Sequence, residues 1–303
     1  MSKLDKYKGI IPAFYAAYDD EGNISPERVQ ALAKHYLKKG VKGLYVGGSS
    51  GECIYQNVNE RKVVLENVMA AVGGQMTIIA HIACLSTRDS VELAKHAAAL
   101  GVDALAAIPP YYFSLSEDAI EAYWTAMIDA TDLDFIIYNI PQTTGYALST
   151  KLFRKLFENE KVIGVKNSSM PTQDIYLFSA NYNRETMVFN GPDEQFIAGR
   201  VMGAAGGIGG TYGVMPELFL KADEAVRDQN LTLAHDIQYA INDIIFELVA
   251  GDGHLYALIK AILAKNGMNI GGVREPLLNV TENDNERINR VDQMIKTAIT
   301  NYC

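Results

Sequence analysis

Residues 25–48, SPERVQALAKHYLKKGVKGLYVGG, contain a complete helix-to-strand unit and decide the fold class. Ser25 precedes a segment whose apolar residues recur at helical spacing, and Gly40 follows that segment. A serine side chain caps the start of a helix well, and glycine is the commonest residue just beyond a helix end. The short apolar run at 42–48 then predicts a strand.

The same unit recurs along the first two thirds of the chain. Residues 86–100 form a second segment of helical periodicity, which opens on Ser86 and stops at Gly101. Alternating strands and helices are typical of an α/β protein with a parallel sheet covered on both faces. Eight such units predict a closed (β/α)8 TIM barrel, with a doubly wound open sheet as the alternative. The strand-like runs lie at 9–18, 42–48, 76–83, 102–110, 134–141, 162–169, 185–191 and 206–213.

The strand signal stops after about residue 225. The remaining segments at 231–250, 253–267 and 285–299 have helical periodicity only, and no low-complexity linker precedes them. We therefore expect a barrel that carries the active site over residues 1–225. A C-terminal helical extension, residues 226–303, is expected to pack on that barrel.

The composition limits the partners that the chain binds. Its 27 basic and 36 acidic residues give a net charge of −9 without a basic run, which argues against nucleic acid or an anionic membrane surface as partner. An anionic small molecule therefore has to be held by a local group of donors. The three cysteines are far apart, and neither a signal peptide nor a membrane-spanning apolar run is recognisable, so we expect a cytoplasmic protein.

In a (β/α)8 barrel, the active site lies on the loops that follow the C-terminal ends of the strands. The second strand ends in GGSSGE, residues 47–52, where Ser49 and Ser50 with nearby backbone N–H groups suit a carboxylate. The same residues match the G-x-S-x-G elbow of serine hydrolases, which is an alternative. A hydrolase also needs a later histidine, and no histidine closes a predicted strand. A small turn without function is the third interpretation.

Lys166 interrupts the apolar run VIGVKNSS at residues 162–169. A lysine at a strand end is often a surface group, and Tyr138 in YNIP, taken alone, is typical of a packing aromatic. The barrel, however, brings these two residues together on neighbouring strands. An amine in an apolar pocket lined by phenols has a lowered pKa and attacks carbonyl carbons. The pair therefore predicts Schiff-base chemistry on a 2-oxo acid.

The loops after the last two strands carry candidate groups for a substrate's hydroxyls. Asp193 and Glu194 follow the seventh strand in NGPDE, where adjacent carboxylates either begin a helix or accept hydrogen bonds from a polyol. The eighth strand ends in GGIGGTYG, which fails the dinucleotide pattern G-x-G-x-x-G because Tyr212 replaces its last glycine. Gly209, Gly210 and Thr211 offer backbone carbonyls and a hydroxyl instead.

The order of the motifs at the strand ends resembles the N-acetylneuraminate lyase and dihydrodipicolinate synthase superfamily of class I pyruvate aldolases. These motifs are, in order, GGSSGE, PPYYF, YNIP, GVKNSS, NGPDE and GGIGGTY. The resemblance covers about residues 9–300. It implies that Lys166 forms a Schiff base with pyruvate and that Tyr138 is the general base and acid. It also implies that Ser49 and Ser50 bind the pyruvate carboxylate and that Ser50 contacts the Tyr138 hydroxyl.

The resemblance carries further expectations about the assembly and the cofactor. Such enzymes need no metal and are typically homotetramers, built as pairs of dimers. Tyr112 in PPYYF is expected to reach into a neighbouring subunit's site, whereas from the residues alone Tyr111 and Tyr112 are equally typical of rim aromatics.

Two features separate the branches of this superfamily. Bacterial dihydrodipicolinate synthases place an arginine two residues after the YN-x-P proline, where this chain has Thr143. Three other features are instead similar to the sialic acid lyases, namely GGS-x-GE, the Asp–Glu pair and GGIG-x-TY. In those enzymes the loops after the seventh and eighth strands hold the sugar's glycerol tail. The substrate-binding residues implied in this way are Ser49, Ser50, Ser168, Gly191, Asp193, Glu194, Gly209 and Gly210.

The chain departs from the sialic acid lyases at two positions. Those enzymes usually read G-Y-D-E and G-S-T-Y, where this chain has Pro192 and Gly210. Each lost hydroxyl is expected to weaken substrate binding by about 1 kcal/mol. The resemblance still predicts reversible cleavage of N-acetylneuraminate to N-acetylmannosamine and pyruvate. Its rivals are a related aldolase or dehydratase for another 2-oxo sugar acid and a non-catalytic sensor of sugar acids.

Overall fold

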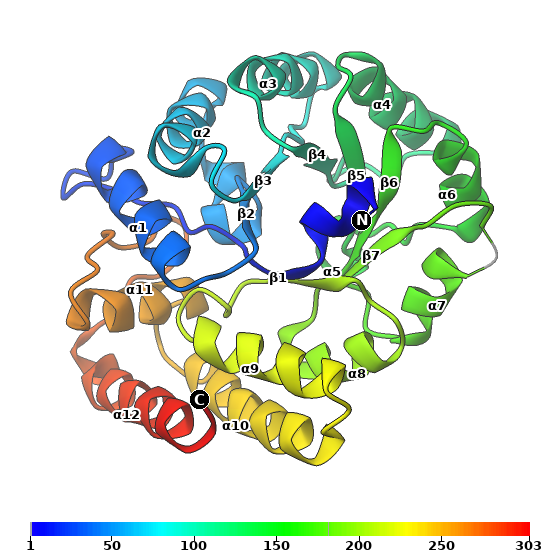
Figure 1. Ribbon diagram of the computed structural model, residues 1–303. Coiled ribbons are helices and arrows are strands. Elements are labelled where there is room, and N and C mark those ends of the chain that lie inside the picture. The colour runs from blue at the N-terminus through cyan, green and yellow to red at the C-terminus, as the bar shows by residue number, and fades with distance from the viewer. Residues whose placement is uncertain (1, 181) are drawn as a thin grey trace.

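The computed structural model describes residues 2–180 and 182–303, and it confirms the predicted (β/α)8 barrel with C-terminal helices (Figure 1). Its sheet has the order β1-β8-β7-β6-β5-β4-β3-β2, and every pair is parallel. The ring closes between β1 and β2, where the Lys42 N–H donates to the Ile10 carbonyl at 2.8 Å and the Phe14 N–H to the Tyr45 carbonyl at 2.9 Å. The strands are β1 (Gly9–Pro12), β2 (Gly43–Val46), β3 (Thr77–His81), β4 (Ala104–Ala107), β5 (Asp134–Asn139), β6 (Val162–Asn167), β7 (Met187–Asn190) and β8 (Gly206–Gly209).

The helices that cover the barrel begin where the sequence predicts. The Ser25 side chain accepts the Arg28 N–H at 3.3 Å, and the Ser86 side chain accepts the Asp89 N–H at 3.1 Å. The helices are α1 (Pro26–Lys38), α2 (Val58–Val72), α3 (Thr87–Leu100), α4 (Glu117–Asp129), α5 (Pro141–Thr144), α6 (Thr150–Phe157), α7 (Gln173–Ser179), α8 (Phe196–Val201), α9 (Pro216–Arg227), α10 (Leu231–Val249), α11 (Leu255–Lys265) and α12 (Asn285–Tyr302). Short 3-10 helices are η1 (Lys3–Tyr7), η2 (Ser49–Gly51), η3 (Cys53–Tyr55), η4 (Asp193–Gln195) and η5 (Glu282–Asp284).

Side chains fill the interior of the barrel, and the N-terminal segment closes one of its ends. Ile11, Ile79 and Ile136 are among the fully buried residues that point inward. η1 lies across the ring in Figure 1, and the Tyr7 hydroxyl donates to Asp134 at 2.8 Å. Since this contact is at the start of β5, the N-terminal ends of the strands are covered. The C-terminal ends of the strands lie at the opposite end of the barrel, which is where the active site of such a barrel is expected.

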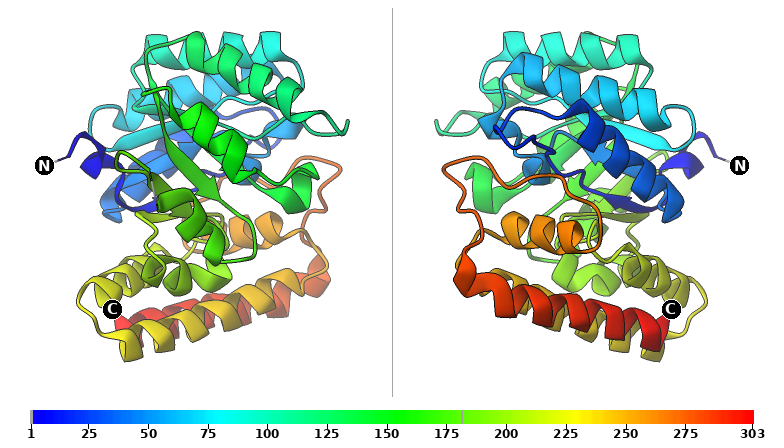
Figure 2. Two further views of the ribbon diagram at one scale, coloured as in Figure 1. Left: turned by 90° about the vertical axis from the view of Figure 1, so that its right-hand side faces the viewer. Right: turned by 90° about the vertical axis from the view of Figure 1, so that its left-hand side faces the viewer.

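α10, α11 and α12 lie along one side of the barrel. Figure 2 shows α10 and α12 side by side, with α11 between them and the barrel. The faces that point inward are apolar, with Ile241 and Leu258 fully buried. Along residues 2–180 and 182–303, no helix combines the length and the hydropathy that a membrane span needs.

Candidate active site

Lys166 lies inside the barrel near the end of β6, paired in register with Tyr138 on β5 and Phe189 on β7. Only 4% of its surface is exposed. Its Nζ lies 3.9 Å from the centre of the Tyr138 ring and 4.3 Å from that of Tyr45. Burial lowers the pKa of Lys166 to about 7, against a smaller opposite effect of Asp193. A substantial fraction of this amine is therefore neutral and nucleophilic at neutral pH.

Tyr138 supplies a protonated phenol beside the amine. Burial raises its pKa to about 12, while hydrogen bonds with the Ser168 and Ser49 hydroxyls act in the opposite direction. The sequence-based prediction that Lys166, Tyr138 and Ser49 come together therefore agrees with the geometry. Ser168, which follows β6, lies at the same phenol.

Ser50 has a different partner from the one that the resemblance implies. Its hydroxyl donates to the Tyr256 hydroxyl at 3.0 Å instead of contacting Tyr138. The reason is that η2 turns consecutive side chains in different directions, so Ser49 faces Tyr138 and Ser50 faces α11. Tyr256 belongs to the C-terminal extension, which therefore contributes to the mouth of the barrel.

A pocket of about 380 Å³ adjoins this group of residues, with Ser49 and Tyr256 in its lining. Ser49 and Tyr55 line it after β2, and Thr143 lines it from α5. His254 and Tyr256 line it at the start of α11. The lining thus combines a few hydroxyl groups with aromatic rings and aliphatic side chains, and the size of the pocket suits a small ligand.

Asp193 and Glu194 are adjacent in sequence but have opposite environments. Asp193 is buried in η4, and its Oδ2 accepts the Thr211 N–H at 2.7 Å and the Thr211 hydroxyl at 2.6 Å. Burial raises the pKa of Asp193 to about 7. Its Oδ1 is buried and has no hydrogen-bond partner among the described residues. The Glu194 side chain is exposed.

Close approach explains two of the glycines that the sequence analysis singled out. A Cβ atom at Gly209 would lie 2.0 Å from Asp193 Oδ1, and one at Gly191 would lie 2.0 Å from the Ser168 Oγ. Any larger residue at either position would displace these side chains. The two glycines therefore set the positions of Asp193 and Ser168.

Tyr112 does not join this site within its own chain. It is 88% exposed, adopts a positive φ of 87° and stacks edge-on against Phe113 at 5.1 Å. The preceding residue, Tyr111, lines the pocket instead.

His81 is a site residue that the sequence analysis missed. The statement that no histidine closes a strand is wrong, because β3 ends at His81 and not two residues later. The ring lies beside Tyr138, with its Nδ1 2.8 Å from the Gly47 carbonyl oxygen, and the Ile108 N–H donates to Nε2 at 3.4 Å. Burial lowers the pKa of His81 to about 3. Both ring nitrogens are thus occupied, which argues against a hydrolase triad.

Tyr45 and Tyr256 were missed as well. Tyr45 lies on β2 at a position whose side chain points inward, a signal that strict alternation along the strand could have revealed. No local signal identifies Tyr256, since its place depends on how the extension packs. Within the described residues, no three His, Cys, Asp or Glu side chains are grouped as a metal site would require.

A buried amine with a lowered pKa, a phenol on the next strand and hydroxyl groups at the mouth of a (β/α)8 barrel are the features of a Schiff-base aldolase site. The comparisons agree with that class. The chain belongs to the Dihydrodipicolinate synthetase family, which matches residues 6–296.

Named relatives are similar along nearly the whole chain. N-acetylneuraminate lyase of Mediterraneibacter gnavus is 58% identical over 300 residues, which cover 98% of this chain and 95% of that protein. N-acetylneuraminate lyase of Clostridium perfringens is 34% identical over 91% of this chain and 95% of that protein. A structure of wild-type sialic acid aldolase of Ruminococcus gnavus has a TM-score of 0.97 at 57% identity and covers 98% of this chain and 100% of that one. Another structure of that aldolase, a catalytic lysine mutant, has a TM-score of 0.98 at 57% identity and covers 100% of both chains.

Proposed function

We propose that this chain is a class I aldolase that reversibly cleaves N-acetylneuraminate to N-acetylmannosamine and pyruvate. The observation that carries the proposal is the buried Lys166 amine with its lowered pKa, 3.9 Å from the Tyr138 ring. A buried amine is costly unless it is neutral, and a neutral amine is what carbonyl addition requires. The identity of 58% to an N-acetylneuraminate lyase supports the choice of sugar.

The reaction begins when Lys166 Nζ attacks the C2 ketone of the open-chain sugar acid. Tyr138 gives its proton to the departing hydroxyl, so loss of water leaves an iminium ion, which is an electron sink at C2, beside a Tyr138 phenolate. Tyr138 then removes the C4 hydroxyl proton, the C3–C4 bond breaks, and its electron pair moves into the iminium to give an enamine. The aldehyde N-acetylmannosamine leaves. Protonation of the enamine at C3 and addition of water release pyruvate and the free amine.

The phenol's raised pKa fits this sequence of steps. In the free site, Tyr138 keeps its proton because its pKa is about 12. Once the iminium has formed beside it, the new positive charge stabilises a phenolate and lowers that pKa. Tyr138 is therefore activated as a base only when the substrate is bound covalently.

The remaining site residues are assigned to the two ends of the substrate. Ser49 and Ser50 bind the carboxylate, for which the Ser49 hydroxyl and the backbone N–H groups of η2 provide donors. The other end, a polyol tail, meets the loops after β6, β7 and β8. The residues assigned to the tail are Ser168, Gly191, Asp193, Glu194, Gly209 and Gly210.

The covalent imine on Lys166 supplies the electron sink, and the proposed steps use no metal or other cofactor. We infer a cytoplasmic homotetramer, a dimer of dimers, in which Tyr112 contacts a neighbouring subunit's site. The exposed Tyr112 and Phe113 support such a contact, because their two rings lie against each other, and contiguous exposed apolar surface is typical of protein interfaces. The division into a catalytic barrel, residues 1–225, and an extension, residues 226–303, stays part of this proposal.

Reductive trapping tests the mechanism. Incubation with pyruvate and sodium borohydride, followed by peptide mass spectrometry, is expected to place one pyruvate-derived mass on Lys166 and on no other lysine. An unlabelled Lys166 in folded protein would overturn the proposal. Pyruvate release from N-acetylneuraminate and from 2-keto-3-deoxygluconate then identifies the substrate, and higher kcat/KM for the second acid would assign the chain to another sugar acid.

A further inference from the structure

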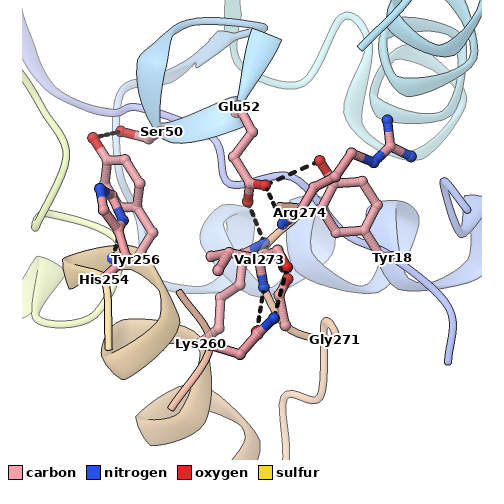
Figure 3. Close-up of polar contacts among 12 residues, drawn as sticks. Tyr18, Ser50, Glu52, His254, Tyr256, Lys260, Gly271, Val273 and Arg274 are labelled. Carbon is pink, nitrogen blue, oxygen red and sulfur yellow. Dashed lines mark hydrogen bonds and ion pairs between the residues drawn. The ribbon is translucent and has the colours of Figure 1, made fainter. Parts of the chain in front are cut away.

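Tyr256 is a phenol of the C-terminal extension that lines the pocket at the mouth of the barrel. It lies in the first turn of α11, next to His254, whose side chain accepts the Tyr256 backbone N–H at 3.2 Å. Figure 3 shows the Tyr256 hydroxyl meeting Ser50, which donates to it at 3.0 Å. The proposed reaction assigns no role to this phenol.

A buried ion pair fixes α11 against the loop after β2, which carries Ser50. Lys260, four residues after Tyr256 and therefore on the same helix face, donates to Glu52 at 2.6 Å, and neither side chain is exposed. Glu52 follows Ser50 by two residues and also accepts the Arg274 backbone N–H at 2.9 Å (Figure 3). Because Ser50 and Glu52 share one loop, α11 holds Tyr256 in a fixed position beside the serine pair.

The hydrogen bonds at Tyr256 leave its own proton available. A phenol has one O–H to donate, and the oxygen already accepts from Ser50. Along residues 2–180 and 182–303, the Tyr256 hydroxyl donates to no protein acceptor. A partly buried donor without an acceptor, at the wall of a pocket, is suited to a ligand's oxygen.

Gly210 lies close against this pair. A Cβ atom there would lie 3.1 Å from the Ser50 Oγ and 3.3 Å from the Tyr256 hydroxyl. Its carbonyl is held by the Tyr15 hydroxyl, so the backbone is fixed. The absence of a side chain at Gly210 thus lets its backbone approach both hydroxyl groups without displacing them.

We propose that Tyr256 is a further substrate-binding residue, whose phenolic proton donates to the carboxylate of the 2-oxo acid beside Ser49 and Ser50. This inference rests on the proposed function. No lysine or arginine is among the described residues that line the pocket, so, apart from the Lys166 amine that reacts with the ketone, the carboxylate is met by neutral donors. A hydrogen bond to an ionised acceptor is stronger than one between neutral groups. Because the Ser50 hydroxyl donates its one proton to Tyr256, the carboxylate receptor then consists of the Ser49 and Tyr256 hydroxyl groups and the backbone N–H groups of η2.

The test is the Tyr256→Phe variant, titrated with pyruvate in the borohydride experiment. Pyruvate has a carboxylate and a ketone but no sugar tail. We expect the pyruvate concentration that gives half-maximal labelling of Lys166 to rise about 10-fold or more. The matched control is Tyr239→Phe, which removes an exposed phenol on α10 and is expected to leave the titration unchanged. Equal thermal midpoints for the three proteins show that the fold is intact.

A double variant separates direct contact from support of Ser50. In a Ser50→Ala background, Tyr256→Phe is expected to weaken labelling by a further factor of about 10. No further change would mean that Tyr256 acts only through Ser50 and would overturn the proposal. An unchanged pyruvate titration with a raised KM for N-acetylneuraminate would also overturn it, since Tyr256 would then contact the tail. Failure of the proposed function is a distinct result, because wild-type Lys166 would not be labelled at all.

Discussion

The Lys166 amine and the Tyr138 ring occupy paired positions on neighbouring strands, with the Nζ 3.9 Å from the ring centre. The ring's π face attracts a cation, but burial acts more strongly and lowers the pKa of Lys166 to about 7. The nucleophile and the proton-transfer group are thus held together by the register of the sheet. No flexible loop is needed to bring them into contact.

The pH dependence of the reaction follows from this lowered pKa. The ammonium form cannot attack a carbonyl, so kcat/KM for pyruvate release is expected to rise as the pH increases through about 7. A pH–rate profile measures the midpoint of this limb. An acidic limb centred near the ordinary lysine value of about 10.4 would contradict the assignment.

Replacement of Lys166 by methionine is expected to remove activity and to stabilise the fold. Pyruvate release should fall by about 1000-fold or more, because the covalent step is lost. The folded state binds the proton more weakly than the unfolded state, so Lys166 reduces stability at every pH below its unfolded pKa. The gain in the free energy of unfolding is expected to be about 2–4 kcal/mol at or below pH 7 and to fade as the pH rises toward 10.

Urea unfolding of wild type, Lys166→Met and Lys95→Met measures this effect. Lys95 is exposed on α3, so its replacement should change neither stability nor activity appreciably. A destabilised Lys166→Met protein would show that the amine is well solvated or paired in the folded state.

Replacement of Tyr138 by phenylalanine separates imine formation from bond cleavage. The ring is kept, so pyruvate should still label Lys166 in the presence of borohydride. Pyruvate release from the sugar acid is expected to fall about 100–1000-fold, because the general acid–base group is lost. The control is Tyr36→Phe, which removes a buried hydroxyl on α1 that has no hydrogen-bond partner in the part of the chain that the structure describes, and it should keep full activity. Equal loss in labelling and release would mean that Tyr138 acts mainly by shaping the pocket.

Replacement of Asp193 by asparagine tests the tail end of the site. Its Oδ1 is the unpartnered acceptor beside Gly209, so loss of its charge should weaken a bond to a sugar hydroxyl. We expect the KM for N-acetylneuraminate to rise about 10-fold while the pyruvate titration stays unchanged. Asp236→Asn, on the exposed face of α10, is the control. A change in the pyruvate titration would place Asp193 at the carboxylate end.

The Glu52–Lys260 pair offers a test of stability. Both side chains are fully buried, so Lys260→Met leaves the Glu52 carboxylate without its cation. The free energy of unfolding should fall by about 3–5 kcal/mol, and Glu52→Gln combined with Lys260→Met should recover part of that loss. Lys62→Met, which breaks a more exposed pair with Glu92, should cost less than about 1 kcal/mol. Equal effects of the two lysine variants would contradict the burial of the first pair.

The barrel and its central pair could be predicted from the sequence because they depend on repeating patterns. Parallel strands end at the same edge, so Tyr138 and Lys166 had to meet once the strands were recognised. The placement of His81 failed because strand ends are uncertain by a few residues in such patterns. That error changed whether His81 closed β3.

Other contacts could not be predicted because they depend on turns and on distant packing. η4 sends the side chain of Asp193 inward and that of Glu194 outward, although the two residues are adjacent. Likewise, the partner of Ser50 is Tyr256, more than two hundred positions away on a helix whose docking no local pattern encodes. Periodicity identifies elements, whereas such pairs are set by tertiary packing.

The position of α11 has a consequence for recombination between relatives. One helix outside the eight-strand repeat carries both a pocket phenol, Tyr256, and the buried cation, Lys260, that fastens the loop of Ser50. A chimaera that takes its C-terminal helices from another family member therefore exchanges part of the substrate pocket together with its anchor. Exchange of these helices is therefore expected to change substrate preference while the Lys166 chemistry, which resides in the barrel, is kept.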